Sequence, residues 1–158
     1  MRALARAEPA KKSSARRHPR GRVVHRRLAE VGHRVFTATG AESSVSSVVV
    51  DPFGNVVIAG IYGGNVDLGG GKQLSFAGGL YDAFVAKFGP ALGNTLWANA
   101  YSSVGREHGA GLAVSSTGML AAHGYFNGAT LQLDATRSLD NKNVSGTTGD
   151  GFGVILKP

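Results

Sequence analysis

The sequence predicts an all-β fold built on a repeated β-hairpin. Residues 48–60 contain two β-branched, apolar runs that flank a four-residue connection. Residues 112–124 repeat this plan, and Gly118 stands where the first hairpin has Gly54. The 24 glycines have no collagen-like period, so they fit the tight turns of an all-β chain. Together these observations predict consecutive antiparallel strands joined by short turns.

The connection of the first hairpin holds residue types that suit a tight turn. Asp51 can accept a hydrogen bond from the backbone two residues on, and Pro52 presets φ for a type I turn. Gly54 can adopt the left-handed conformation that returns the chain as a bulged hairpin. We expect a second turn of this kind at residues 115–118, with Gly118 in the place of Gly54.

The chain divides into a basic leader and a body. Residues 1–34 hold eleven Lys and Arg against two Glu, a net charge of +9, whereas the other residues hold six basic and eight acidic side chains, a net charge of −2. Because such dense like charges repel one another and no apolar period is sustained, residues 1–32 are predicted to be a disordered leader. With 42% hydrophobic and 17% charged residues overall, residues 33–158 suit a globular body.

The leader offers little to a specific partner. It lacks the apolar segment of about 7 to 15 residues that a secretory signal needs, although its Arg-rich, acid-poor composition also resembles an organelle transit peptide. No segment of the chain approaches the roughly 18 consecutive apolar residues of a membrane span. Residues 1–34 could attract phosphate backbones by releasing counterions, but they hold no aromatic residue to interleave with bases. Weak, non-specific binding of nucleic acid is the most that they predict.

The body can be written as two copies of one four-strand unit, at residues 33–90 and 94–158. The offset between equivalent positions drifts from 61 to 68, so small insertions are expected in loops while strands keep their register. Such a repeat is typical of propeller blades, and it predicts about two four-stranded antiparallel blades of a partial β-propeller. Aromatic residues recur at equivalent positions and are expected to pack between blade faces. They are Phe36 and Phe84 in the first copy and Trp97 and Phe152 in the second.

The repeat count predicts self-association or association with other propeller blades. Each copy is expected to begin with a strand, at residues 33–38 and 94–99, so that the chain holds two complete strand sets. Two blades share only one interface and leave two outer faces bare, and repeat arrays generally need about three or more units. We expect about three or four copies to complete a ring of six to eight blades, or a marginal, aggregation-prone monomer. The sequence does not identify a different protein partner.

Three stretches carry a resemblance to a known family. Residues 50–60, residues 64–70 and residues 82–88, followed by a strand with Leu96 and Trp97, resemble the bacterial SBBP-type β-propeller repeat. The resemblance covers roughly residues 33–158, and the second copy is a degenerate match. It implies the blade fold and an extracytoplasmic or cell-surface setting. It implies no catalytic residues, because these repeats share none.

The sequence contains no recognised catalytic or metal-binding motif. It has no cysteine, which excludes a disulfide framework, a thiolate metal site and a cysteine nucleophile. Residues 69–72 resemble a phosphate loop, but Val66 and Gln73 stand where that motif needs Gly and Ser or Thr. No His-x-x-x-His pair and no Gly-x-Ser-x-Gly elbow occurs. We therefore predict no catalytic residue, no metal site and no cofactor.

Several polar residues have structural roles that explain them. Glu107 and His108 could form an acid/base pair, but adjacent side chains seldom converge on one proton, so a solvated pair is expected. His123 is expected to be a hydrogen-bonded or edge-facing strand residue. Four recurring acids lack the spacing of a calcium loop, and turn and strand-entry roles account for them. They are Asp51, Asp67, Asp82 and Asp150.

The sequence favours a non-enzymatic β-propeller-repeat protein that acts as a structural or interaction scaffold. Two alternatives stay open. The first is a nucleic-acid or anionic-surface binder that uses the leader. The second is a hydrolase or lyase whose site is completed only in an assembled propeller. Function in propellers lies in loops grafted onto the blades, so the fold does not decide among the three.

Overall fold

The computed structural model describes residues 32–40, 42–143 and 148–158. The predicted leader therefore lies outside the described residues, except for its last residue. The described chain is all-β, as predicted, with antiparallel sheets and one short 3₁₀ helix, η1 (Pro90–Leu92). None of its helical structure is long and apolar enough to cross a membrane. The strands in chain order are β1 (Thr37–Ala38), β2 (Ser43–Val50), β3 (Val56–Tyr62), β4 (Val66–Asp67), β5 (Gln73–Leu74), β6 (Asp82–Phe88), β7 (Thr95–Tyr101), β8 (Glu107–Val114), β9 (Leu120–Phe126), β10 (Thr130–Gln132), β11 (Ser138–Asp140) and β12 (Asp150–Leu156).

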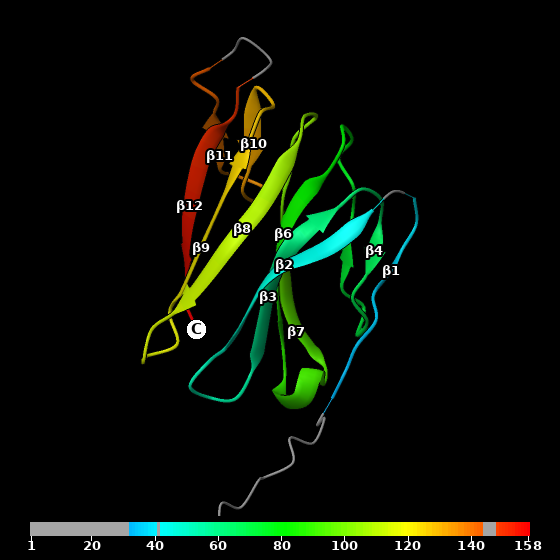
Figure 1. Ribbon diagram of the computed structural model, residues 1–158, viewed down its shortest axis with the longest axis vertical. Coiled ribbons are helices and arrows are strands. Elements are labelled where there is room, and N and C mark those ends of the chain that lie inside the picture. Colours follow the sequence, from blue (N-terminus) through cyan, green and yellow to red (C-terminus); the bar gives the residue numbers. More distant parts are fainter. Residues whose placement is uncertain (1–31, 41, 144–147) are drawn as a thin grey trace, which may run out of the picture.

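The first large sheet, called sheet 1, has four antiparallel strands in the order β2-β3-β6-β7 (Figure 1). Its central strands have near-continuous apolar sequences, and nearly every residue of β3 and β6 is buried. Such runs are typical of strands that are covered on both faces. Strand β2 instead forms an edge of the sheet and keeps most of its side chains exposed.

The second large sheet, called sheet 2, has three antiparallel strands in the order β8-β9-β12. These strands correspond to β2, β3 and β6 of sheet 1. The two hairpins share even a bulge, because the register of β2 on β3 shifts at Ser46 and that of β8 on β9 shifts at Ala110, 64 residues later. A bulge inserts one unpaired residue and changes the face on which the following side chains lie. Because it recurs, equivalent residues of the two hairpins lie on equivalent faces.

The structure corrects the expected strand sets. Strand β7, which covers most of residues 94–99, pairs with β6 and closes sheet 1. Sheet 2 therefore has three strands in the described part of the chain, where four were predicted. The physical reason is that only residues 89–94, with η1 among them, join β6 to β7, and so short a connection favours antiparallel neighbours. The boundary between the two sequence copies therefore differs by one strand from the boundary between the two sheets.

Two small sheets lie beside the large ones. Strands β1, β4 and β5 form one of them, in the order β1-β4-β5, and strands β10 and β11 form the other. Within residues 33–38, which were expected to form the first strand of the first copy, only β1 pairs with another strand, and its partner is β4. Strands β4 and β5 follow β3 as β10 and β11 follow β9, so this pair of short strands also belongs to the repeat.

The main hydrophobic core lies between sheets 1 and 2, which stack face to face. Strand β8 lies against β2 and β3 (Figure 1). In the described part of the chain the two sheets do not close into a ring. The buried side chains of this core are Val57, Ala59, Ala83 and Val85 from sheet 1, Tyr101 from β7, and Leu120, Ala122, Phe126, Leu131 and Phe152 from the second repeat.

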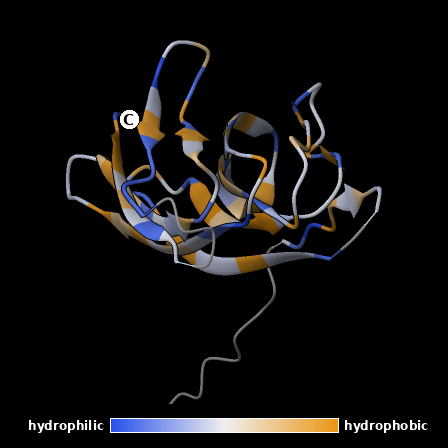
Figure 2. Cartoon of the chain, turned by 90° about the horizontal axis from the view of Figure 1, so that it is seen from above, coloured by the Kyte–Doolittle hydropathy of each residue, from blue (hydrophilic) through white to orange (hydrophobic). Residues whose placement is uncertain are grey.

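A second apolar cluster covers the other face of sheet 1. It joins Ile58, Tyr62 and Phe84 of sheet 1 to residues of the β4–β5 segment, and Phe36 packs against it from the start of the body. Figure 2 shows apolar residues in orange along the strands of both sheets. Sheet 1 therefore buries both of its faces around β3 and β6, whereas sheet 2 buries only the face that meets sheet 1.

Candidate functional site

The predicted turn residues lie in two closely similar hairpin turns. Oδ1 of Asp51 accepts hydrogen bonds from the backbone N–H groups of Phe53 and Asn55, each at 2.9 Å. Pro52 lies inside this turn, and Gly54 has a left-handed φ of 81°. In the second hairpin the Ser115 hydroxyl takes the place of the carboxylate and accepts a hydrogen bond from Met119 N–H at 3.0 Å. Gly118, the counterpart of Gly54, has a φ of 86°.

Asp51 also forms a buried ion pair with Lys87 of β6. The Nζ and Oδ2 atoms are 2.8 Å apart, and the two side chains are 7% and 0% exposed for Lys87 and Asp51. Burial raises the pKa of Asp51, but hydrogen bonds from Lys87 and Asn55 outweigh it and hold the pKa well below its usual range. In the second repeat Ser115 and Ile155 stand at these two positions, so both charges are replaced together. The pair therefore anchors a hairpin and leaves no charge free for a ligand.

The four recurring acids lie apart in the fold, and each accepts a backbone hydrogen bond. Besides the bonds to Asp51, Gly69 N–H donates to Asp67 at 2.7 Å, Ala77 N–H donates to Asp82 at 2.7 Å, and Lys142 N–H donates to Asp150 at 2.6 Å. Within the described residues, no group of three or more His, Asp or Glu side chains could hold a metal ion.

A buried carboxyl pair lies where the two sheets meet. Tyr81 and Arg106 form a parallel bridge, and Glu107 N–H donates a hydrogen bond to the Tyr81 carbonyl at 2.8 Å. This bridge brings the first residue of β6, Asp82, beside the first residue of β8, Glu107. Both side chains are 0% exposed. The junction of the two sheets therefore encloses two acids whose hydrogen bonds come from Ala77 and Ser103 and not from a basic side chain.

The hydrogen bonds of this pair leave one oxygen without a donor. Glu107 accepts bonds from both the backbone N–H and the hydroxyl of Ser103, the former at 2.8 Å. Asp82 accepts through Oδ2, but its Oδ1 is buried without a hydrogen-bond donor. The two carboxyl groups lie within hydrogen-bonding reach of each other, and the Tyr62 hydroxyl, which donates to the Ser75 carbonyl at 3.2 Å, also lies close to Asp82. A proton on Glu107 can therefore supply the donor that Asp82 lacks.

Burial dominates the titration of the pair. It raises the pKa of Glu107 to about 7, and the neighbouring Asp82 adds to this rise although the hydrogen bonds from Ser103 oppose it. Burial raises the pKa of Asp82 as well. Two carboxyl groups that share a proton can act as acid and base in catalysis. Here, however, both side chains are fully enclosed, so a substrate cannot reach them without opening the junction.

The expected solvated pair of Glu107 and His108 is wrong. The two side chains lie on opposite faces of β8, and the His108 ring stacks on Tyr125 with centroids 5.4 Å apart, on the outer side of sheet 2. The buried acid was missed because strict alternation along β8 would place Glu107 on the outer face, opposite Leu112, whereas the bulge at Ala110 brings it to the inner face. His123 lies on β9 and is exposed.

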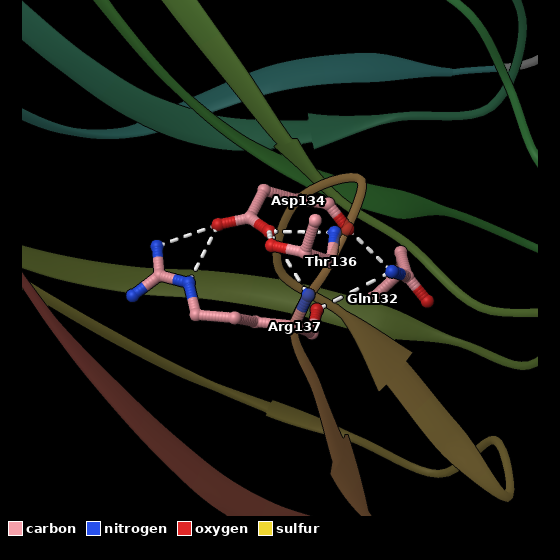
Figure 3. Close-up of polar contacts among 4 residues, drawn as sticks. All are labelled: Gln132, Asp134, Thr136 and Arg137. Atoms are coloured by element: carbon pink, nitrogen blue, oxygen red, sulfur yellow. Dashed lines mark hydrogen bonds and ion pairs between the residues drawn. The ribbon is translucent and has the colours of Figure 1, made fainter.

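The loop between β10 and β11 holds a polar turn (Figure 3). Asp134 accepts bonds from the backbone N–H groups of Thr136 and Arg137, both at 2.9 Å, and its Oδ2 lies 2.6 Å from the Arg137 guanidinium. The bond from the Thr136 backbone and those from Arg137 lower the pKa of Asp134 well below its usual range. Beside this loop, Asn99, Tyr101 and Arg137 line a groove of about 390 Å³ that follows β12. The groove thus borders an edge of sheet 2 that no strand covers in the described residues.

An exposed apolar stripe lies on β2 and is called the valine face. It consists of Val45, Val48 and Val50, which are 50%, 60% and 59% exposed. Val48 and Val50 pair with Ile58 and Val56, which lie on the face of sheet 1 that turns away from sheet 2. Three neighbouring valines on one edge strand are an unusual exposure for a monomer, and such patches mark interaction sites.

A second bare surface lies on the outer side of sheet 2 and is called the small-residue face. It consists of Ala113, Ala121, His123, Gly153 and Ile155, which come from all three strands of the sheet. These residues line a hollow of about 390 Å³, and Ile155 is 68% exposed. These five residues include no Asp, Glu, Lys or Arg, so another sheet could cover this surface.

The four recurring aromatic residues lie at both apolar clusters. Phe152 belongs to the core between the sheets, and Trp97 packs against that core. Phe84 belongs to the cluster on the far face of sheet 1, where Phe36 stacks on Phe88 with ring centroids 5.4 Å apart. Phe36 thus approaches sheet 1 from the side on which no second large sheet lies in the described chain.

Comparison of the chain with models of protein families, with curated proteins and with solved structures finds no match. The function of this chain is therefore inferred from its own geometry. That geometry offers an enclosed acid pair and two bare sheet faces. Residues 1–31, which include most of the predicted anionic-surface binder, lie outside the described residues.

Proposed function

We propose that this chain is a non-enzymatic interaction scaffold built from β-propeller-type repeats, of the bacterial SBBP-type that its sequence resembles. The observation that supports this most is the distribution of polar and apolar groups. The acids that could do chemistry are enclosed at the junction of the sheets, whereas apolar sheet surface is exposed on both outer sides. This is the reverse of what a catalytic cleft needs, since a cleft presents polar groups to its substrate.

The scaffold is proposed to work by stacking further repeat units on its bare faces. Repeat units bury their apolar faces on one another, and two units have too few neighbours to cover both ends of the stack. The valine face and the small-residue face are the two ends of the stack in this chain. An extracytoplasmic or cell-surface setting, which the resemblance implies, is part of the proposal.

The mass of the full chain in solution tests this function. Light scattering after size exclusion, over a dilution series from about 100 to about 1 µM, should show species larger than the 16.3 kDa monomer that dissociate on dilution. The far-ultraviolet circular dichroism of the same samples should remain that of a β protein. A compact monomer that melts cooperatively at every concentration would contradict the scaffold, because it would show that the bare faces need no partner.

A further inference from the structure

We propose that copies of this chain associate head to tail, with the small-residue face of one copy packed on the valine face of the next. The proposal rests on the scaffold function above and names its partner, which is a second copy of the same chain. Residues 33–38 of the second copy supply the fourth strand that sheet 2 of the first copy lacks. An interface that the chain already forms between its own two sheets supports this contact.

The valine face has a packed counterpart inside the chain. Through the shared hairpin register, Val48 of β2 corresponds to Leu112 of β8, and Val50 corresponds to Val114. Leu112 and Val114 pack against the core between the two sheets. The same positions on sheet 1 are largely exposed, because no second large sheet lies on that side in the described chain and the small sheet β1-β4-β5 leaves them uncovered. The valine face is therefore one half of a sheet-to-sheet contact that has no partner.

The small-residue face supplies the other half. Ala121 and His123 of β9 correspond to Val57 and Ala59 of β3. Val57 and Ala59 are buried in the core between the sheets, on the face of sheet 1 that meets sheet 2. The chain thus contains one surface of each kind in contact and one of each kind bare. We therefore expect the two bare surfaces to pack on each other as their buried counterparts do.

Space for the incoming sheet exists next to the valine face. A groove of about 200 Å³ lies there, and most of its lining side chains are apolar, among them Phe36, Val45 and Phe84. In the second repeat the corresponding region is filled by sheet 1. The net charge of the body is only −2 over residues 35–158, so the parts of the two copies that would meet carry little net charge to oppose the contact.

The outer edge of β12 completes the contact. The equivalent edge of β6 is covered by β7, whereas β12 pairs only with β9 in the described residues. Residues 33–38 lie in the same position relative to sheet 1 as β7 does relative to sheet 2. Phe36 packs on the far cluster of sheet 1, and its counterpart Trp97 packs on the core that faces sheet 2. Likewise β1 pairs with β4, and Ser102, which follows β7, bridges Gln132 of β10.

The geometry of this contact has a consequence for assembly. Two different surfaces meet, so every copy keeps one free surface of each kind until a ring closes. About three or four copies would give the six to eight sheets of ordinary propellers. A two-fold contact, by contrast, would bring like surfaces together and would leave β12 without its additional strand.

A charge on the valine face should weaken association of the full chain. In the proposed contact, Val48→Glu places a carboxylate against the small-residue face, where His123 is the only basic side chain. We expect the concentration for half-association to rise about 100-fold or more. Val104→Glu is the matched control, because Val104 is 79% exposed and lies on the loop before β8, outside both faces. It should change that concentration less than about twofold.

Cysteine pairs test the orientation directly, because the natural chain has no cysteine. Inside the chain the Ser46 hydroxyl donates a hydrogen bond to the Gly109 carbonyl. The counterparts of these residues are Ala110 and Val45, which are both exposed. An oxidised mixture of Ala110→Cys and Val45→Cys chains should therefore yield at least about tenfold more crosslinked dimer than either variant alone. Val104→Cys replaces Val45→Cys in the control mixture and should remain at the background level.

The outcomes separate this inference from the scaffold function. Loss of association in Val48→Glu together with the mixed crosslink supports the head-to-tail contact. Oligomers that persist in Val48→Glu and give no mixed crosslink overturn the head-to-tail contact but leave the scaffold function in place. Efficient crosslinking of one variant alone overturns it in favour of a two-fold contact. A monomer at every concentration overturns both proposals.

Discussion

Replacement of Glu107 by Gln should remove a pH dependence of the free energy of unfolding. Burial raises the pKa of Glu107 from its ordinary value of 4.5 to about 7 in the folded chain. The folded chain thus binds this proton more tightly than the unfolded chain does. As pH rises from about 4.5, the unfolded state loses its proton first, and stability must fall until the folded state is ionised as well. The contribution of Glu107 is therefore fully present below about pH 4.5 and is lost as pH rises through about 7.

The magnitude follows from the two pKa values. A tenfold change in proton concentration corresponds to about 1.4 kcal/mol, so the interval from 4.5 to about 7 amounts to about 3 kcal/mol. Gln cannot ionise, and its amide can still accept a bond from Ser103 while its NH₂ group offers Asp82 Oδ1 the donor that it lacks. We expect Glu107→Gln to be more stable than the natural chain at about pH 8, by up to about 3 kcal/mol. The two should be similar at about pH 5.

Urea unfolding followed by the fluorescence of Trp97, the only tryptophan, measures this difference. The natural chain and Glu107→Gln are compared at several pH values between about 5 and 8. Glu42→Gln is the matched control, because Glu42 is exposed and its bond from the Tyr81 hydroxyl, at 3.4 Å, can still be accepted by the Gln carbonyl. If Glu107→Gln loses stability with pH as steeply as the natural chain, or is the less stable of the two at pH 8, the shared-proton account of the junction is wrong.

Two further predictions concern the first hairpin and use the same unfolding assay at about pH 7. Lys87→Met should cost about 3 kcal/mol or more, because Asp51 would stay buried without its counter-charge. The double variant Asp51→Ser, Lys87→Ile reproduces the residue types of the second repeat and should regain most of this loss; equal stability of the single and double variants would contradict the pairing. Gly54→Val should cost more than about 1 kcal/mol, since its φ of 81° suits a β-branched residue poorly. An unchanged midpoint of thermal unfolding would refute that argument.

The all-β fold could be predicted because its signals are local. The strand β3 and its turn are encoded within a few residues, where Asp51 supplies acceptors for backbone N–H groups and Gly54 supplies the left-handed conformation. The grouping of strands into sheets is not local. Equivalence of residues 33–38 and 94–99 shows that a strand recurs, but not which neighbour it pairs with. The short connection of residues 89–94 was the available signal that β7 belongs beside β6.

The carboxyl pair could not be predicted, because it depends on contacts between distant parts of the chain. Asp82 and Glu107 meet only after sheets 1 and 2 have stacked and the Tyr81–Arg106 bridge has formed. Strict alternation along β8 would also place Glu107 on the wrong face, because the bulge at Ala110 changes the face on which its side chain lies. The bare faces, in contrast, follow from the repeat count, since two sheets can cover each other only once.

The proposed contact between copies differs in its polar groups from the contact inside the chain. Ser46 and Ser47 each link β2 to β8, through bonds to the Gly109 carbonyl and from Leu112 N–H. Their counterparts on the small-residue side are Ala110 and Gly111, which have no hydroxyl group. Two hydrogen bonds that help to hold the sheets of one copy together are therefore absent between copies. The contact between copies must depend mainly on apolar burial and on the edge of β12.

Close packing is reduced in the same place. Gly109 lets the two sheets of one copy approach, since a Cβ atom there would lie 2.9 Å from the Gly60 carbonyl oxygen. The counterpart of Gly109 at the contact between copies is Val45, and its side chain would hold the next sheet further away. Both differences weaken the contact between copies relative to the contact within one. The head-to-tail assembly is therefore expected to be reversible and dependent on concentration, while the pair of sheets inside each copy stays intact.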